Sequence, residues 1–207
     1  MLNTAALMAF VPTFFFVSIT PGMCMTLSMS LGMTIGVKRA LWMMAGELVG
    51  VGIVATSAVI GVAAIMLNFP ALFIAFKVAG GLYLGYLGVQ LWRSRGKLAL
   101  SQQPEQQRQA SWKELAWQGF ITAIANPKGW AFFIALLPPF LDPDISMSHQ
   151  LPALLGIILL LEFVCLLIYA SGGKSLSLLL KTQSNVRVIN RCAGTLMLGV
   201  GVWLVAS

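Results

Sequence analysis

Charged residues are scarce in this chain of 207 residues, at 9% of the total. An average soluble domain carries roughly 25%. Hydrophobic residues make up 58% and the mean hydropathy is +0.88. The chain therefore lacks the polar surface that a water-soluble fold requires, and its composition predicts an all-α integral membrane protein.

Cysteine, histidine and acidic residues are also few. The three cysteines, Cys24, Cys165 and Cys192, are far apart and lie in apolar runs, and the chain has one histidine and six acidic residues. Without a paired-cysteine or Cys/His motif, a thiol relay, a disulfide scaffold and a zinc site lose support, and the cysteines are interpreted as small buried hydrophobes. The sequence indicates no metal site and no cofactor.

Long apolar runs are what the chain does have, and about 20 such residues span a bilayer as a helix. The N-terminal run lacks a basic n-region and a clear cleavage site, so we expect it to remain as the first span. Six transmembrane helices are predicted, at residues 4–30, 41–67, 71–92, 115–141, 151–172 and 189–206. The polar stretch 93–114 is predicted to be a mobile linker on the cytoplasmic side, between 1–92 and 115–207.

The net charge of +7 has a topological meaning. Nucleic-acid binding would need a basic face on a soluble domain, whereas here the basic residues fall between apolar runs. Six spans put eleven of them on one side: Lys38, Arg39, Arg93, Arg95, Lys97, Arg108, Lys113, Lys174, Lys181, Arg187 and Arg191. The positive-inside rule makes that side cytoplasmic, so both termini are predicted on the opposite side of the membrane.

Two stretches of the first half recur in the second. "KVAGGLYLG" (77–85) pairs with "RCAGTLMLG" (191–199), and "ELVGVGIVA" (47–55) pairs with "EFVCLLIYA" (162–170), at nearly equal spacing. The order of matches indicates a duplication. Because each half holds three spans, the second half enters the membrane from the opposite side. The predicted architecture is a 3+3 inverted-topology repeat, which is typical of secondary transporters.

A proline motif also recurs, as "TPG" (20–22) and "NPK" (126–128). A proline inside a helix frees a carbonyl, and unpaired backbone in lipid is tolerated only where it faces protein or a wet cavity. A tolerated kink is the alternative for a single proline, but a matched pair beside polar residues favours a shared site. The predicted substrate-binding residues are Thr20, Pro21, Gly22, Asn126, Pro127 and Lys128. Helix N-terminal amides suit a carboxylate, and freed carbonyls with the Thr20 and Asn126 side chains suit an ammonium group.

Charged residues within spans usually mark a pathway or relay. Glu162 has long apolar flanks, so it is the stronger candidate for proton coupling. Glu47 is a second candidate, although it lies close enough to the cytoplasmic end of its span to snorkel. Lys77 is either a charge partner or an interfacial anchor, and Lys128 either binds a substrate carboxylate or balances a glutamate.

Four segments together resemble the LysE/RhtB family of bacterial amino-acid exporters: "TPG", "LGMTIGVKRALWMMAGELVG", "KVAGGLYLGYLGVQLWRS" and "ANPK". The resemblance covers essentially the whole chain. It implies export of amino acids or derivatives driven by the proton gradient, with Pro21, Gly22 and "NPK" on the family's two proline motifs and Glu47 at a position where many members carry an acid. The first motif here continues as "PGMC", where many members have "PGP-N" or a close variant.

Other functions stay open at this point. Export of another metabolite, a cation or a metal is one, although soft ligands and acids are few. An intramembrane protease would need a spaced Ser/His or Asp/Asp pair, and His149 is predicted in an outer loop. A passive channel or an assembly subunit would lack dependence on the proton gradient. The oligomeric state is open, a homodimer included.

Overall fold

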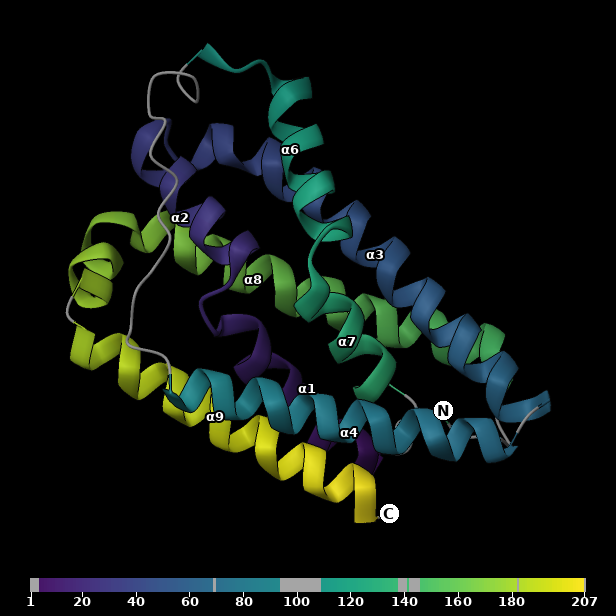
Figure 1. Cartoon of the computed structure of the whole chain (residues 1–207). Coiled ribbons are helices and arrows are strands. Elements are labelled where there is room, and N and C mark those ends of the chain that lie inside the picture. The colour runs from purple at the N-terminus through teal and green to yellow at the C-terminus, as the bar shows by residue number, and fades with distance from the viewer. Residues whose placement is uncertain are drawn as a thin grey trace.

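The structure is a computed structural model, and it describes residues 4–68, 70–93, 109–137, 141, 146–181 and 183–206. Every regular element among these residues is a helix (Figure 1). The named helices are α1 (Thr4–Ile19), α2 (Met23–Thr34), α3 (Val37–Asn68), α4 (Pro70–Arg93), α6 (Trp112–Ile124), α7 (Pro127–Leu136), α8 (Met147–Lys181) and α9 (Gln183–Ala206). The all-helical prediction is therefore confirmed for the described part of the chain.

The described helices lie where the sequence predicts apolar spans, and two of the predicted spans are each divided into a pair of helices. Among the described residues, Val37–Gly61 and Met147–Gly173 are long and apolar enough to cross a membrane. The pair Phe10–Ile19 and Met23–Thr34 passes the same test as one span bent by 58°. Two or three spans thus meet this criterion, and the count of six stays a prediction.

Both divided helices break at the predicted proline motifs. Between α1 and α2, the chain leaves the helix at Thr20 and re-enters it at Met23, so Pro21 lies in the connection. Between α6 and α7, Asn126 is the N-cap and Pro127 is the first residue of the new helix. A proline is well tolerated there because the first helical N–H has no intrahelical partner to lose.

Glycines let α3 and α6 cross with their backbones nearly in contact. A Cβ added at Gly46 would lie 1.8 Å from the Ala116 carbonyl oxygen, and one added at Gly119 would lie 2.0 Å from that of Met43. Small residues serve this purpose in membrane helices, which cannot rely on a hydrophobic drive for association. Gly36 has a different function, since its φ of 83° forms the turn from α2 into α3.

Helices α4 and α9 pack side by side along one flank of the bundle (Figure 1). Their own glycines meet there, because a Cβ at Gly88 would lie 2.8 Å from the Gly194 carbonyl oxygen. Two more glycines of α4, Gly81 and Gly85, differ in whether they meet α9 closely. A Cβ added at Gly201 would lie 2.6 Å from the Gly81 carbonyl oxygen, whereas a Cβ added at Gly85 would meet nothing within 4 Å.

The buried side chains that the structure describes form two hydrophobic clusters. One is rich in aromatic rings and includes Phe10, Phe14, Phe132 and Phe133, all at most 4% exposed. The other is rich in sulfur and gathers methionines of α2 and α3 around α8: Met25, Met29, Met43 and Met44. Both broken helices contribute to the interior, so their unpaired backbone ends lie among protein atoms rather than lipid.

Candidate functional site

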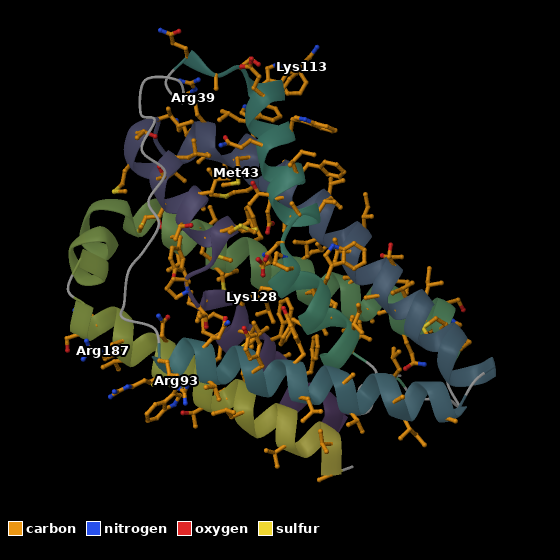
Figure 2. The ribbon with its side chains drawn as sticks, in the orientation of Figure 1. Arg39, Met43, Arg93, Lys113, Lys128 and Arg187 are labelled. Atoms are coloured by element: carbon orange, nitrogen blue, oxygen red, sulfur yellow. The ribbon has the colours of Figure 1, made fainter. Side chains whose placement is uncertain are left out.

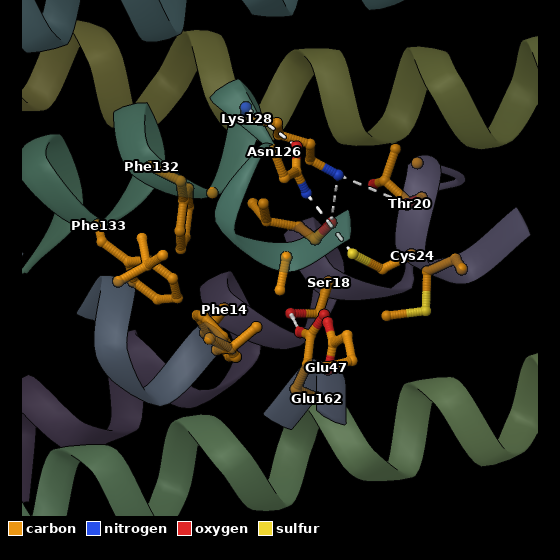
Figure 3. Close-up of a pocket in the computed structure, with 17 residues that line it drawn as sticks. Phe14, Ser18, Thr20, Cys24, Glu47, Asn126, Lys128, Phe132, Phe133 and Glu162 are labelled. Carbon is orange, nitrogen blue, oxygen red and sulfur yellow. Dashed lines mark hydrogen bonds between the residues drawn. The ribbon is translucent and has the colours of Figure 1, made fainter. Parts of the chain in front are cut away.

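A cavity of about 60 Å³ lies at the level of the two helix breaks. Six helices and the connections at the two breaks line it, through Phe14, Val17, Ser18, Thr20, Gly22, Cys24, Met25, Glu47, Val51, Val54, Ala123, Asn126, Lys128, Gly129, Phe132, Phe133 and Glu162 (Figure 3). A water molecule needs roughly 10–15 Å³ of such space. The cavity therefore has room for several water-sized groups, which favours a small ligand.

The carbonyl groups freed at the end of α1 are satisfied by side chains from the second half of the chain. The ammonium group of Lys128 donates to the carbonyl oxygens of Val17 at 3.0 Å and Thr20 at 3.5 Å. The Tyr169 hydroxyl, on α8, donates to the carbonyl of Ile19 at 2.8 Å. The first break is thus closed by groups more than one hundred residues away in sequence.

The second break is closed mostly by its own neighbours. The Asn126 side-chain oxygen accepts from the Lys128 backbone N–H at 3.1 Å, and the Trp130 indole N–H donates to the Ile124 carbonyl at 2.9 Å. The Asn126 amide also reaches the Cys24 sulfur at 3.8 Å. Asn126 therefore caps α7 and contacts the first turn of α2, which joins the two breaks.

The start of α2 is arranged differently from the start of α7. Its N-cap is Gly22, so no side chain caps it, and Thr26 is the first residue whose N–H bonds back, to the Gly22 carbonyl at 2.9 Å. The first N–H groups of a helix have no intrahelical partner and carry a partial positive charge. Both Gly22 and Lys128 line the cavity, so its wall combines a helix N-terminus with an ammonium group.

Two carboxylates line the cavity opposite this positive wall. Glu162 accepts a hydrogen bond from the Ser18 hydroxyl at 2.6 Å (Figure 3). Glu47 is 0% exposed, and neither of its carboxylate oxygens has a hydrogen-bond partner. Of the two alternatives for Glu47, snorkelling to the cytoplasmic surface is not seen, because the crossing of α3 with α6 encloses this part of α3. A buried carboxylate without a partner is costly and calls for a proton or a cation.

The predicted site residues are thus placed in three ways. The cavity is lined by Thr20, Gly22, Asn126, Lys128, Glu47 and Glu162. Pro21 and Pro127 form the two breaks but do not line it. Lys77 lies in α4, and its side chain is outside the part that the structure describes. Within the described residues, no group of three or more His, Cys, Asp or Glu side chains could hold a metal ion.

Among the basic side chains that the structure describes, Lys128 is the one that lines the cavity. Figure 2 shows Arg39, Arg93, Lys113 and Arg187 at the periphery of the bundle and Lys128 near its middle. The three N–H groups of a lysine can serve three acceptors, and the structure uses two of them, on the carbonyl oxygens of Val17 and Thr20. One donor therefore remains for a ligand in the cavity.

Sequence reasoning missed two polar groups of the cavity. Ser18 lies at the end of α1, next to the first break, and its bond to Glu162 joins positions 144 residues apart. Cys24 was interpreted as a small buried hydrophobe, and it is buried, but it also lines the cavity and contacts Asn126. The departure of "PGMC" from the family motif was the available signal for Cys24.

An all-helical, strongly apolar chain with charged groups around an internal cavity at two helix breaks has the features of a membrane translocator. The chain belongs to the LysE type translocator family, whose model matches residues 14–207. This family and the names of its relatives indicate a transporter rather than an enzyme.

Three relatives align with this chain over nearly its whole length. A homoserine/homoserine lactone efflux protein of Salmonella typhimurium is 25% identical over 199 residues, which cover 96% of this chain and 95% of the relative. A threonine efflux protein of Escherichia coli is 26% identical over 208 residues, which cover 100% of this chain and 95% of the relative. An uncharacterized membrane protein of Vibrio cholerae is 25% identical over 190 residues, which cover 92% of this chain and 91% of the relative. No solved structure matches the chain.

Proposed function

We propose that this protein exports small amino acids or related zwitterions across the bacterial cytoplasmic membrane, by proton antiport with alternating access. The observation that carries the proposal is the composition of the cavity, where Lys128 faces Glu47 and Glu162 between two helix breaks. A zwitterion has the complementary pair of charges. The names of the efflux relatives support the same substrate class.

The substrate carboxylate binds at the positive wall. Lys128 provides its remaining N–H, and the uncapped start of α2 at Gly22 provides backbone N–H groups and the positive end of a helix dipole. The substrate ammonium group binds at Glu47 and Glu162. Thr20 donates its hydroxyl proton to the Phe16 carbonyl at 2.7 Å, so its oxygen is left to accept from that ammonium group.

Competition for the buried carboxylates provides the coupling to protons. Glu47 and Glu162 both line the cavity, and an ionised carboxylate in a low-dielectric interior calls for a proton or a cation. The substrate ammonium group binds to an ionised carboxylate, and a proton on that carboxylate removes the charge that binds it. Because the two occupants exclude each other, proton entry drives substrate release, which is the requirement of an antiporter.

The architecture that we propose is six spans in a 3+3 inverted repeat. Helices α1 and α2 correspond to α6 and α7, α3 to α8, and α4 to α9. Pro21 and Pro127 then hold equivalent breaks, and Lys77 of α4 corresponds to Arg191 of α9 as a candidate charge partner. One half rocks against the other around the cavity, which opens it to each side in turn.

Both termini are proposed to lie outside the cytoplasm. In Figure 1 the two marked chain ends lie on the right of the bundle and the turn between α2 and α3 lies on the upper left. Epitope tags at each end, tested for access in intact cells, check this arrangement. Tags on opposite faces of the membrane would contradict a three-span half and the pseudo-symmetry with it.

Efflux from loaded cells tests the transport function. Cells that express the protein are loaded with dipeptides, and amino acids that leave are compared with those from cells without it. We expect faster efflux of at least one amino acid, abolished by a protonophore. If no amino acid leaves faster and none is better tolerated, the export proposal fails, and efflux that persists without a proton gradient indicates a channel.

Glu162→Gln tests proton coupling, with Glu114→Gln as the matched control. Glu162 lines the cavity, whereas Glu114 is an exposed acid at the start of α6. We expect both variants to reach the membrane at equal amounts and only Glu162→Gln to lose the dependence of efflux on the pH gradient. Normal coupling in that variant would remove Glu162 from the mechanism.

A further inference from the structure

The cavity is polar at one end and apolar at the other, and two helices show this along one face each. On α3, Glu47 is followed by Val51 and Val54, at a spacing that puts all three on one side of the helix. On α7, Lys128 is followed by Phe132 one turn later. On both helices the charged group lies at the end of the cavity near the two breaks, and a hydrocarbon side chain follows about one turn farther along the helix.

The broken helix α1 shows the same gradient from the other direction. Ser18, which bonds Glu162, lies next to the break, and Phe14 lies one turn farther away. The Phe14 ring centroid lies 5.6 Å from that of Phe132 and 6.0 Å from that of Phe133. Figure 3 shows the three rings together on one side of the labelled polar groups.

The apolar end offers no side-chain hydrogen bond to a ligand. Among the described residues its walls are Phe14, Val51, Val54, Ala123, Phe132 and Phe133, all of them hydrocarbon and at most 7% exposed. A hydroxyl group moved from water into such a place loses its hydrogen bonds without replacement. The limited size of the cavity also restricts how large a side chain this end can hold.

We propose that the cavity selects zwitterions with a small, purely apolar side chain, valine being the model substrate, over the isosteric hydroxyl amino acid threonine. This inference rests on the proposed export function and adds the substrate side chain to it. The charged head group binds at the breaks, between Lys128 and the two glutamates, and the side chain lies at the apolar end, against Val54 of α3 and Phe132 of α7. The relatives named for threonine and homoserine efflux would then differ from this chain in selectivity.

The expected discrimination follows from the isosteric pair. Valine and threonine have nearly the same shape, so packing does not separate them, and the difference is the unpaired hydroxyl. Hydrophobic protein pockets reject such an added hydroxyl by factors up to about a hundred. We therefore expect transport of valine to exceed that of threonine by roughly ten- to a hundredfold at equal, subsaturating concentrations.

The experiment measures this ratio in proteoliposomes that contain the full-length protein and labelled valine and threonine in competition. Val54→Thr adds a hydroxyl to the apolar end, and Val59→Thr is the matched control. Both valines lie on α3 in the same core cluster, but Val59 does not line the cavity. The hydroxyl of a threonine in a helix can donate to the backbone carbonyl four residues earlier, so both variants should fold. The hydroxyl oxygen can still accept a hydrogen bond from a ligand.

We expect Val54→Thr to lower the valine-to-threonine ratio several-fold and Val59→Thr to leave it unchanged. Equal transport of both amino acids by the unchanged protein, or faster transport of threonine, overturns the selectivity while leaving export intact. A ratio that Val54→Thr does not move, in a variant that still transports, overturns the placement of the side chain. If vesicles with protein release no amino acid faster than empty ones, export and selectivity both fail.

Discussion

Replacement of Gly46 by alanine is expected to disturb the site through the backbone, although Gly46 is not a cavity residue. The added Cβ would lie 1.8 Å from the Ala116 carbonyl oxygen, where real contacts are not closer than 3.0 Å. The obstacle is backbone, so no side-chain rotation relieves it. Helices α3 and α6 must therefore separate by at least about 1 Å, which is more than a close-packed interior accepts without cost.

The magnitude follows from two opposing effects. Alanine is preferred over glycine within a helix by roughly 0.5–1 kcal/mol. Overpacking of a tight contact costs about 1–3 kcal/mol, and a backbone obstacle belongs at the upper end. The net loss is about 2 kcal/mol, which corresponds to roughly 4–8 °C in the unfolding midpoint of a protein of this size. Separation of α3 from α6 also displaces Glu47, so efflux should fall several-fold.

The matched control is Gly61→Ala, on the same helix. A Cβ at Gly61 would meet nothing within 4 Å, so only the helix preference acts and the midpoint should stay equal or rise by a few degrees. Both variants are purified in the same detergent and heated, and the fraction that remains monodisperse is measured at equal heating rates. A midpoint for Gly46→Ala that equals or exceeds that of Gly61→Ala would refute the close crossing of α3 and α6.

Three further outcomes are expected. Ser18→Ala removes the hydroxyl that donates to Glu162 at 2.6 Å, so we expect efflux to fall about fivefold or more, the rate equivalent of roughly 1 kcal/mol, at unchanged membrane levels. In a variant with Cys165 and Cys192 replaced by serine, a saturating substrate should slow the alkylation of Cys24, because Cys24 lines the cavity. Equal alkylation rates with and without substrate would place the ligand elsewhere. The Ser111 backbone N–H, followed by its hydroxyl, holds the pKa of Glu114 below its ordinary value of 4.5. This cap should therefore be complete above pH 4.5 and be lost as the pH falls through the lowered pKa. Its loss should be visible as faster amide hydrogen exchange at the start of α6, after correction for the intrinsic exchange rate. Glu114→Gln should remove this pH dependence.

The breaks of the two divided helices were predictable because proline occurred twice beside polar residues. Proline alone was not the signal, since Pro12 and Pro152 lie inside α1 and α8 without dividing them. The matched position in the two halves distinguished Pro21 and Pro127 from these. Local chemistry also explains the second break, where an asparagine precedes a proline and caps the new helix.

The interior partners were not predictable from local patterns. Glu47 lies near the start of α3, where a surface position is a reasonable expectation, but the crossing of α6 covers it. Ser18 becomes a site residue only because α8 brings Glu162 to it. The distances that decide these roles join positions far apart in sequence, and no periodicity of a single helix carries that information. The apolar end of the cavity was hidden for the same reason, since valine and phenylalanine are common throughout the chain.

The lysine that crosses from the second break to the first has a mechanical consequence. Lys128 lies in the first turn of α7, yet its ammonium group donates to the carbonyl oxygens of Val17 and Thr20 at the open end of α1. One flexible side chain therefore joins the two broken helices, and their separation requires that the hydrogen bonds of the Lys128 ammonium group to Val17 and Thr20 be replaced by others. A substrate carboxylate in the cavity is another acceptor for the Lys128 ammonium group, so a bound substrate would weaken the contact between the two broken helices.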